Sequence, residues 1–140
     1  MTKAWGMIDK LATGQKSIES RWYNRKLAPW GKISPGESIY FKNVGEPVTL
    51  QAQVNKVSYF SDLIPQRVLS ILEQYRGDLG IEPGQLPTFY ERYRHKRYAI
   101  LIFLKGVQHI SPFEIDRTGY GAMSAWLCVE NVDQIRVPQR

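Results

Sequence analysis

The sequence is poor in the residues that most often bind metals or form disulfides. It contains one cysteine, Cys128, and two histidines, His95 and His109. A single cysteine excludes a disulfide within the chain, and so few soft ligands argue against a structural zinc site. Cys128 lies in the apolar run AWLCV, which favours a small buried thiol over a nucleophile. We therefore expect neither a metal nor a cofactor.

Long apolar segments and familiar catalytic motifs are also missing. No apolar run approaches the roughly 20 residues of a membrane-spanning helix, and the N-terminal MTKAWGMIDK carries charges where a signal peptide is apolar. The motifs H-E-x-x-H, G-x-S-x-G and C-x-x-C do not occur. GQKS resembles the end of a phosphate-binding loop, but Lys10 stands where the earlier glycine belongs. These absences predict a soluble cytoplasmic protein without membrane contact.

Positive charge is in excess and is concentrated in two segments. The net charge is +6, and residues 1–32 hold seven Lys and Arg against two acids, while residues 90–97 hold four against one. Both segments also contain several Trp or Tyr residues. Basic surface interleaved with flat rings suits a polyanion whose bases can stack, which favours nucleic acid as a partner. The alternative is an ordinary basic protein whose aromatic rings belong to its core.

The spacing of apolar residues predicts an α+β fold. Helical spacing predicts a first helix that begins near Trp5 and ends at Gly14. Alternation and unbroken apolar runs predict strands at 17–23, 37–43, 48–54 and onward to 59, 98–104, 109–116 and 124–130. A β-bulge is expected near Asn55, where the alternation slips.

Two helices are predicted between the strands, in an insertion at about residues 61–95. The first is expected to be capped by Ser61, with Ile64 among its inward residues, and the second to start near Pro83. We therefore expect a single domain over residues 1–140, with five to six strands in a small mixed or antiparallel β-barrel. An N-terminal helix and the two-helix insertion complete it.

The stretch GQKSIESRW, residues 14–22, crowds charges of both signs. In a strand, Glu19 and Arg21 point to one side while Trp22 points to the other, toward a core. Lys16 lies at the turn before the strand. One interpretation is an exposed Glu19–Arg21 pair, which stabilises a fold by only ~0.2–1 kcal/mol. The other is a polar pocket for a flat, polar ligand.

Residues 14–21 have the spacing G-x-K-x-x-E-x-R, which resembles the signature of the ASCH domain, the homology domain of activating signal cointegrator. Three later segments resemble motifs of the family and occur in the same order: KISPGESIYF, QAQVNKVSYF and SPFEIDRTGYGAMSAWL. In the first, Glu37 stands where Asp is commoner. The resemblance spans about residues 4–136. It implies a PUA-like barrel, with a cleft lined by the octet that takes a base, a nucleoside or an RNA segment.

The residue types in the octet suit such a cleft. Lys16 offers a compact cation, Arg21 a planar fork for a phosphate or a base edge, and Glu19 an acceptor for exocyclic amines. Further ligand- or RNA-binding residues are expected in the two basic segments: Tyr23, Arg25, Lys26, Arg92, Arg94, Lys96 and Arg97. The alternative for residues 90–97 is the polar face of a helix whose tyrosines point inward.

The resemblance also raises a catalytic alternative. Some small ASCH members hydrolyse acetylcytidine and are implied to use a lysine, a threonine and a distal glutamate. The lysine maps onto Lys16, but the threonine maps onto Glu19, and a carboxylate does not replace a hydroxyl nucleophile. Asp78, and after it Glu73, matches the distal acid loosely. Lys16 and Glu19 could still act as catalytic acid and base on water, or on RNA as in members linked to RNA cleavage.

Binding of RNA or a nucleotide-like ligand is therefore the predicted function, ahead of a hydrolase acting on an acetylated cytidine-like amide or on RNA. An interaction module that presents Trp5 or Trp30 to a protein partner stays open, and an exposed aromatic patch would favour it. Neither histidine is expected to be catalytic: His95 adds surface charge, and His109 is structural.

Overall fold

The computed structural model describes residues 6–26, 30–43 and 45–114. Its elements, in chain order, are α1 (Met7–Thr13), β1 (Ile18–Tyr23), β2 (Ser38–Lys42), β3 (Val48–Phe60), α2 (Pro65–Tyr75), a short 3-10 helix η2 (Pro83–Gln85), α3 (Leu86–Tyr93) and β4 (Tyr98–Phe113). The predicted strand at 124–130, with Cys128, lies outside the described residues, as does Trp5.

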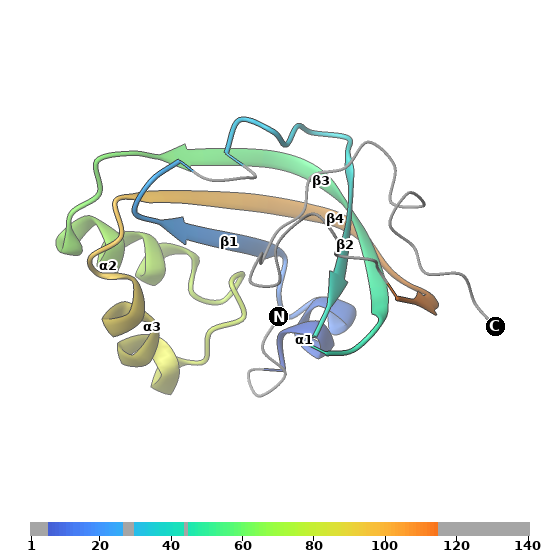
Figure 1. Ribbon diagram of the computed structural model, residues 1–140. Coiled ribbons are helices and arrows are strands. Elements are labelled where there is room, and N and C mark those ends of the chain that lie inside the picture. Colours follow the sequence, from blue (N-terminus) through green and yellow to red (C-terminus); the bar gives the residue numbers. More distant parts are fainter. Residues whose placement is uncertain (1–5, 27–29, 44, 115–140) are drawn as a thin grey trace.

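The strands form one curled antiparallel sheet in the order β1-β4-β3-β2 (Figure 1). β4 lies between β1 and β3, and its residues Ala99, Ile100, Leu101 and Ile102 are fully buried. This confirms that the apolar run at 98–104 is a central strand. With three helices, the sheet gives a curled half-barrel of the α+β class, as predicted, and it has four strands in the part of the chain described.

Two details of the long strands bear on the predictions. The β3–β4 register shifts between Val54 and Lys56, which confirms the bulge near Asn55. The segment HISPF was expected to form a separate strand, but it continues β4. The chain passes through Gly106 with φ +61° without leaving the sheet, which glycine does at little steric cost.

The helices begin and end where local chemistry allows. Gly14 ends α1 as predicted: it has φ +83°, and its N–H donates to the carbonyl of Leu11. α2 begins at Pro65, so Ser61 does not cap it. Proline suits the first turn because its missing N–H would have no helical partner there. Ile64, expected inside, precedes the helix and is 58% exposed.

The apolar side chains form two cores, one on each face of the sheet. The helix-side core joins β1 and β4 to the insertion, and its buried members include Ile18, Trp22, Leu63, Val68, Ile71, Leu72, Phe89 and Leu101. The curl-side core lies within the curve of the sheet, and its buried members include Leu11, Ile33, Ile39, Phe41, Leu50, Ala52, Val54, Ile100 and Ile102. Figure 1 shows α2 and α3 together beneath one end of the sheet. β1 therefore has packed side chains on both faces.

Candidate nucleic-acid interface

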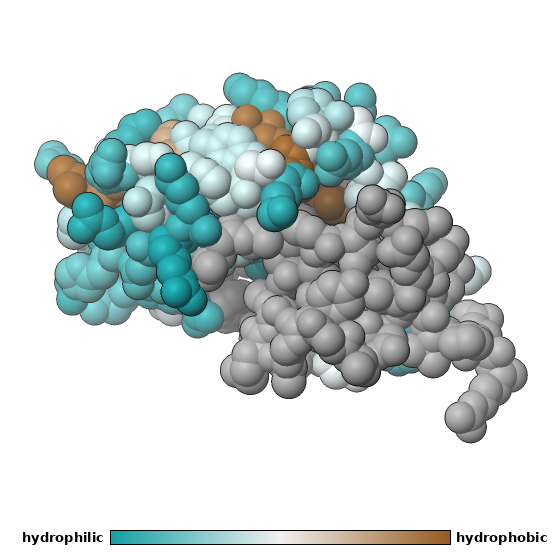
Figure 2. Space-filling model, turned by 45° about the horizontal axis from the view of Figure 1, so that its top comes forward, coloured by the Kyte–Doolittle hydropathy of each residue, from teal (hydrophilic) through white to brown (hydrophobic). Residues whose placement is uncertain are grey.

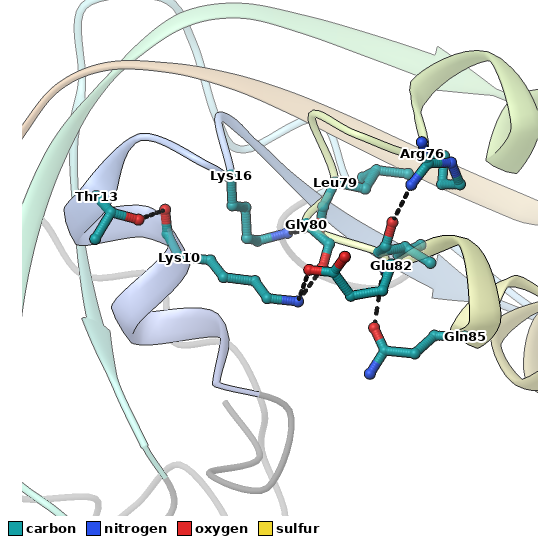
Figure 3. Close-up of polar contacts among 9 residues, drawn as sticks. Lys10, Thr13, Lys16, Arg76, Leu79, Gly80, Glu82 and Gln85 are labelled. Carbon is teal, nitrogen blue, oxygen red and sulfur yellow. Dashed lines mark hydrogen bonds and ion pairs between the residues drawn. The ribbon is translucent and has the colours of Figure 1, made fainter.

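The buried side chain of Lys16 joins the start of β1 to the loop after α2 by hydrogen bonds. The side chain is only 3% exposed, and Nζ donates to the carbonyl oxygens of Ile18 at 2.6 Å and Leu79 at 2.9 Å. Figure 3 shows the lysine reaching across to that loop. An ammonium group has three N–H donors, so one donor remains for a further acceptor.

The electrostatic surroundings of Lys16 link the three charged residues of the octet. Burial lowers the pKa of Lys16 below its usual value, because desolvation penalises the charged form. Glu19 acts in the opposite direction and raises this pKa, while Arg21 and Lys10 lower it further. Glu19 and Arg21 therefore both lie within electrostatic reach of Lys16.

The loop after α2 is fastened to this site mainly by its backbone. The N–H groups of Ser17 and Ile18 both donate to the carbonyl of Asp78, at 2.8 and 2.9 Å. Lys10 Nζ donates to Gly80 O at 2.6 Å and pairs with Glu82 at 3.4 Å (Figure 3). Asp78, the expected distal acid, therefore has its backbone beside β1, but its side chain is exposed.

Glu19 is buried and incompletely hydrogen-bonded. It is 6% exposed, and Oε1 accepts a hydrogen bond from the N–H of Ser20 at 3.0 Å. Oε2 is buried and accepts no hydrogen bond from the described residues. A buried acceptor without a partner costs about 1–3 kcal/mol, and such groups are retained mainly where they have a use. The interpretation of Glu19 as one half of an exposed surface pair is therefore wrong.

The register places Glu19, Arg21 and Tyr23 on one face of the sheet, as alternation predicted. Arg21 lies opposite Ile100, a member of the curl-side core, and Tyr23 lies opposite Tyr98. On the other face, the indole of Trp22 stacks on Tyr93 with ring centroids 4.9 Å apart. Trp22 is thus a packing residue that anchors β1 on the insertion.

The two basic segments meet at one end of the sheet. β1 ends at Tyr23 and β4 begins at Tyr98, and the N–H of Arg97 donates to Tyr23 O at 3.1 Å. Arg25 and Lys26, which follow β1, therefore lie at the same end as Arg97, and all three are exposed. Sequence alone gave two separate basic runs, because their meeting depends on strand pairing.

An aromatic cluster lies at this end of the sheet, formed by Lys26, Trp30, Tyr59 and Tyr98. Trp30 meets Tyr59 and Tyr98 edge-to-face, with ring centroids 4.8 and 5.5 Å away. Lys26 Nζ lies 5.6 Å from the Trp30 ring and 5.9 Å from the Tyr98 ring, within cation–π range. Tyr59 was not expected in such a cluster from the sequence pattern. Before the bulge, every second residue of β3 from Leu50 to Val54 points into the curl-side core. The bulge shifts this alternation by one residue, so that Tyr59 pairs with Ile100 of that core.

The rest of the basic run belongs to α3 and the turn after it. Arg94 pairs with Glu91 at 3.2 Å, Arg92 lines a shallow depression with Pro87 and Thr88, and Lys96 is half-buried. Both tyrosines of α3 pack against the helix-side core, as the helical alternative for this run predicted. Burial raises the pKa of Tyr93, while Arg92 lowers it and Glu19 raises it.

Other predicted residues are placed without a functional contact. His95 and His109 are exposed, as is Glu73 on α2. Within the described ranges, no three His, Cys, Asp or Glu residues are grouped to hold a metal ion. None of the helices in these ranges is long and apolar enough to cross a membrane.

The curled sheet and its inserted helices form an α+β fold like that of solved ASCH proteins. Solved structures similar to this chain include the ASCH protein of Zymomonas mobilis, with a TM-score of 0.57 and 16% identity over 81% of this chain and 69% of that one. Two mutants of the same protein are also similar to this chain, with TM-scores of 0.57 and 0.56. At this identity the likeness shows the fold alone. No family model and no curated protein sequence matches the chain.

Proposed function

We propose that this protein binds RNA or a nucleotide-like ligand on the sheet face that carries Glu19 and Arg21. The observation that supports this most is the meeting of the two basic segments, through Arg25, Lys26 and Arg97, at the end of that face. Phosphates are held by clustered cations, and bases are read by planar or acceptor groups beside them. The ASCH-like fold is consistent with such a ligand.

The residues of the site have different parts in this proposal. Glu19 Oε2, buried and without a described donor, is an acceptor for an exocyclic amine of a base. Arg21 supplies a planar fork for a phosphate or a base edge. Lys16 is a positioning residue, because its Nζ already holds two backbone carbonyls and fixes the start of β1.

The proposal is tested by titrating short single-stranded RNA against the native protein and two conservative variants. Glu19→Gln replaces the acceptor oxygen by a donor, and Arg21→Gln removes the charged fork. Each is expected to weaken binding about fivefold to a hundredfold, since such contacts contribute about 1–3 kcal/mol. The matched controls are Glu37→Gln and Lys105→Gln, both at exposed positions. Unchanged affinity in both site variants, with folding intact by circular dichroism, would remove the pocket assignment.

A second candidate, hydrolysis of an acetylated cytidine amide, is favoured by the same buried carboxylate. Glu19 would accept a proton from water as it adds to the carbonyl, and would return it to the amine as the C–N bond breaks. The products are acetate and cytidine. Release of acetate from acetylcytidine, abolished by Glu19→Gln, is the expected result, and no release by the native protein eliminates this candidate.

The interaction-module alternative has one supporting feature, since Trp30 belongs to the aromatic cluster, but the basic residues beside that cluster favour a polyanion over a protein partner. The exposed large hydrophobic side chains of the described residues are Tyr59, 40% exposed, and Ile64, 58% exposed. On the face in Figure 2, hydrophilic residues predominate and hydrophobic residues form small separate groups. Scattered apolar side chains of this kind are ordinary on protein surfaces.

A further inference from the structure

The aromatic cluster shares a sheet face with the proposed site. Arg21 of β1 lies opposite Ile100 of β4, and Ile100 lies opposite Tyr59 of β3. Directly opposed residues on neighbouring strands point to the same face, so Arg21 and Tyr59 lie on one face two strands apart. Two interstrand spacings make this separation about 10 Å. Tyr98 and Tyr23 form the next row toward the end of the sheet.

The geometry of the rings leaves aromatic surface for a ligand. Trp30 meets Tyr59 and Tyr98 at interplanar angles of 66° and 75°, so these tyrosine rings are not stacked face to face on the indole. Among the described residues, Tyr59 is the aromatic residue whose side chain is exposed, at 40%. A buried ring would serve packing alone, whereas an exposed one beside other rings can receive a base.

The charge beside the rings selects the class of ligand. Lys26 lies against Trp30 and Tyr98, and Arg25 and Arg97 are exposed at the same end of the sheet. Aromatic rings combined with a positively charged groove or track are the way proteins hold single strands, because every base has a face that can stack. In a duplex the bases stack on one another and their faces are not available to side chains.

We infer that the aromatic cluster is a stacking site for a base that neighbours the nucleotide at Glu19 and Arg21. The ligand is then a single-stranded oligonucleotide rather than a lone nucleotide or a duplex. This inference rests on the proposed function, which it deepens by naming the form of the nucleic acid. Ile100, which lies between Arg21 and Tyr59, is fully buried, so the oligonucleotide would pass around the end of the sheet, where Arg25, Lys26 and Arg97 are exposed, to place nearby bases at both positions.

The test compares three probes: oligocytidine, cytidine monophosphate and a blunt RNA duplex. Tyr59→Leu keeps apolar bulk but removes the ring, and Lys26→Gln removes the charge beside it. Loss of one base-stacking contact is expected to weaken oligocytidine binding by about fivefold to a hundredfold. Affinity of Tyr59→Leu for cytidine monophosphate is expected to stay unchanged. Tyr40→Leu is the matched control, because Tyr40 packs edge-to-face on Phe113, with ring centroids 6.0 Å apart, in another part of the sheet.

The outcomes separate this inference from the proposed function. Equal affinity of the native protein for oligocytidine and the mononucleotide overturns the inference, as does unchanged oligocytidine binding in both Tyr59→Leu and Lys26→Gln. Mononucleotide binding that depends on Arg21 but not on Tyr59 would keep the proposed function in either case. Absence of binding to all three probes would overturn both. If Tyr59→Leu does not fold, the comparison of oligocytidine with cytidine monophosphate on the native protein still decides the matter.

Discussion

At the scale of single residues, Lys16 combines a structural role with an electrostatic one. A buried ammonium group is unfavourable unless its hydrogen bonds and a counter-charge offset the loss of water. Two backbone carbonyls and the nearby Glu19 supply that compensation. The same contacts join the start of β1 to the loop after α2. Lys16 therefore holds in place the strand that presents Glu19 and Arg21.

Replacing Lys16 by methionine is expected to change how stability depends on pH. The pKa of Lys16 in the folded protein is below its usual 10.5, so between these two values the unfolded chain binds more protons. The free energy of unfolding of the native protein should therefore rise, relative to Lys16→Met, as the pH increases through this window toward 10.5. Urea unfolding at a series of pH values measures the difference. A difference that falls with pH would contradict a lowered pKa.

Gly80 is expected to tolerate no side chain. Its φ is +77°, and an added Cβ would lie 3.2 Å from the Cβ of Lys16 and 3.2 Å from the sulfur of Met7. Left-handed backbone alone costs about 1–2 kcal/mol for an L-residue, and crowding adds to it. Gly80→Ala should thus lower the free energy of unfolding by at least about 1 kcal/mol in urea titrations.

The matched control is Gly84→Ala, where nothing lies within 4 Å of the added Cβ. Its effect should stay within about 0.5 kcal/mol, as for most surface substitutions. Equal effects at the two glycines would show that the loop after α2 is not packed on Lys16 as described.

At the scale of elements, the insertion stabilises the strand that carries the site. α2 and α3 pack on the face of β1 opposite Glu19 and Arg21, and the contact is made by Trp22 on Tyr93. Burying large apolar side chains of this kind contributes about 1.5–3 kcal/mol each. The helices therefore support the site from behind without supplying its charged face.

Shortening one isoleucine in α2 and one just before it should affect stability to different extents, because one side chain is buried and the other is exposed. Ile71 is fully buried in the helix-side core, and Ile64 is 58% exposed just before the helix. Ile71→Ala is expected to cost about 2–5 kcal/mol, because it removes packed methyl groups and leaves a cavity. Ile64→Ala should change stability by less than about 0.5 kcal/mol. Thermal and urea unfolding of both variants provide the measurement, and similar losses would refute the assigned faces.

Local sequence patterns predict some features of these elements but not others. The unbroken apolar run of β4 predicts a strand that is buried on both faces. The alternation in β1 predicts a strand with one apolar face and one polar face. Ser61 is a good helix cap in isolation, yet the helix begins at Pro65, whose ring suits the first turn. The bulge near Asn55 was visible, but the face that Tyr59 takes beyond it depends on pairing with β4.

At the scale of the whole molecule, the proposed site depends on strand pairings that no local sequence pattern contains. Antiparallel pairing of β1 with β4 brings Arg25 and Lys26 to the same end as Arg97. It also places Tyr98 and Tyr59 on the face of Arg21. The burial of Lys16 likewise arises only when the loop after α2 docks on β1. Motif spacing indicated these site residues, and the fold determines their environment.

The most direct test is the salt dependence of single-stranded RNA binding by the native protein and by Arg25→Gln/Arg97→Gln. Each phosphate contact contributes about 0.7 to the slope of log affinity against log salt for a single strand, so the double variant should lose about 1.4 of that slope. The control of equal charge is Lys56→Gln/Lys105→Gln, at exposed positions on β3 and β4. It should keep most of the native slope. A native protein that binds no RNA, or a slope equal in the native protein and Arg25→Gln/Arg97→Gln, would contradict an RNA-binding surface at this end of the sheet.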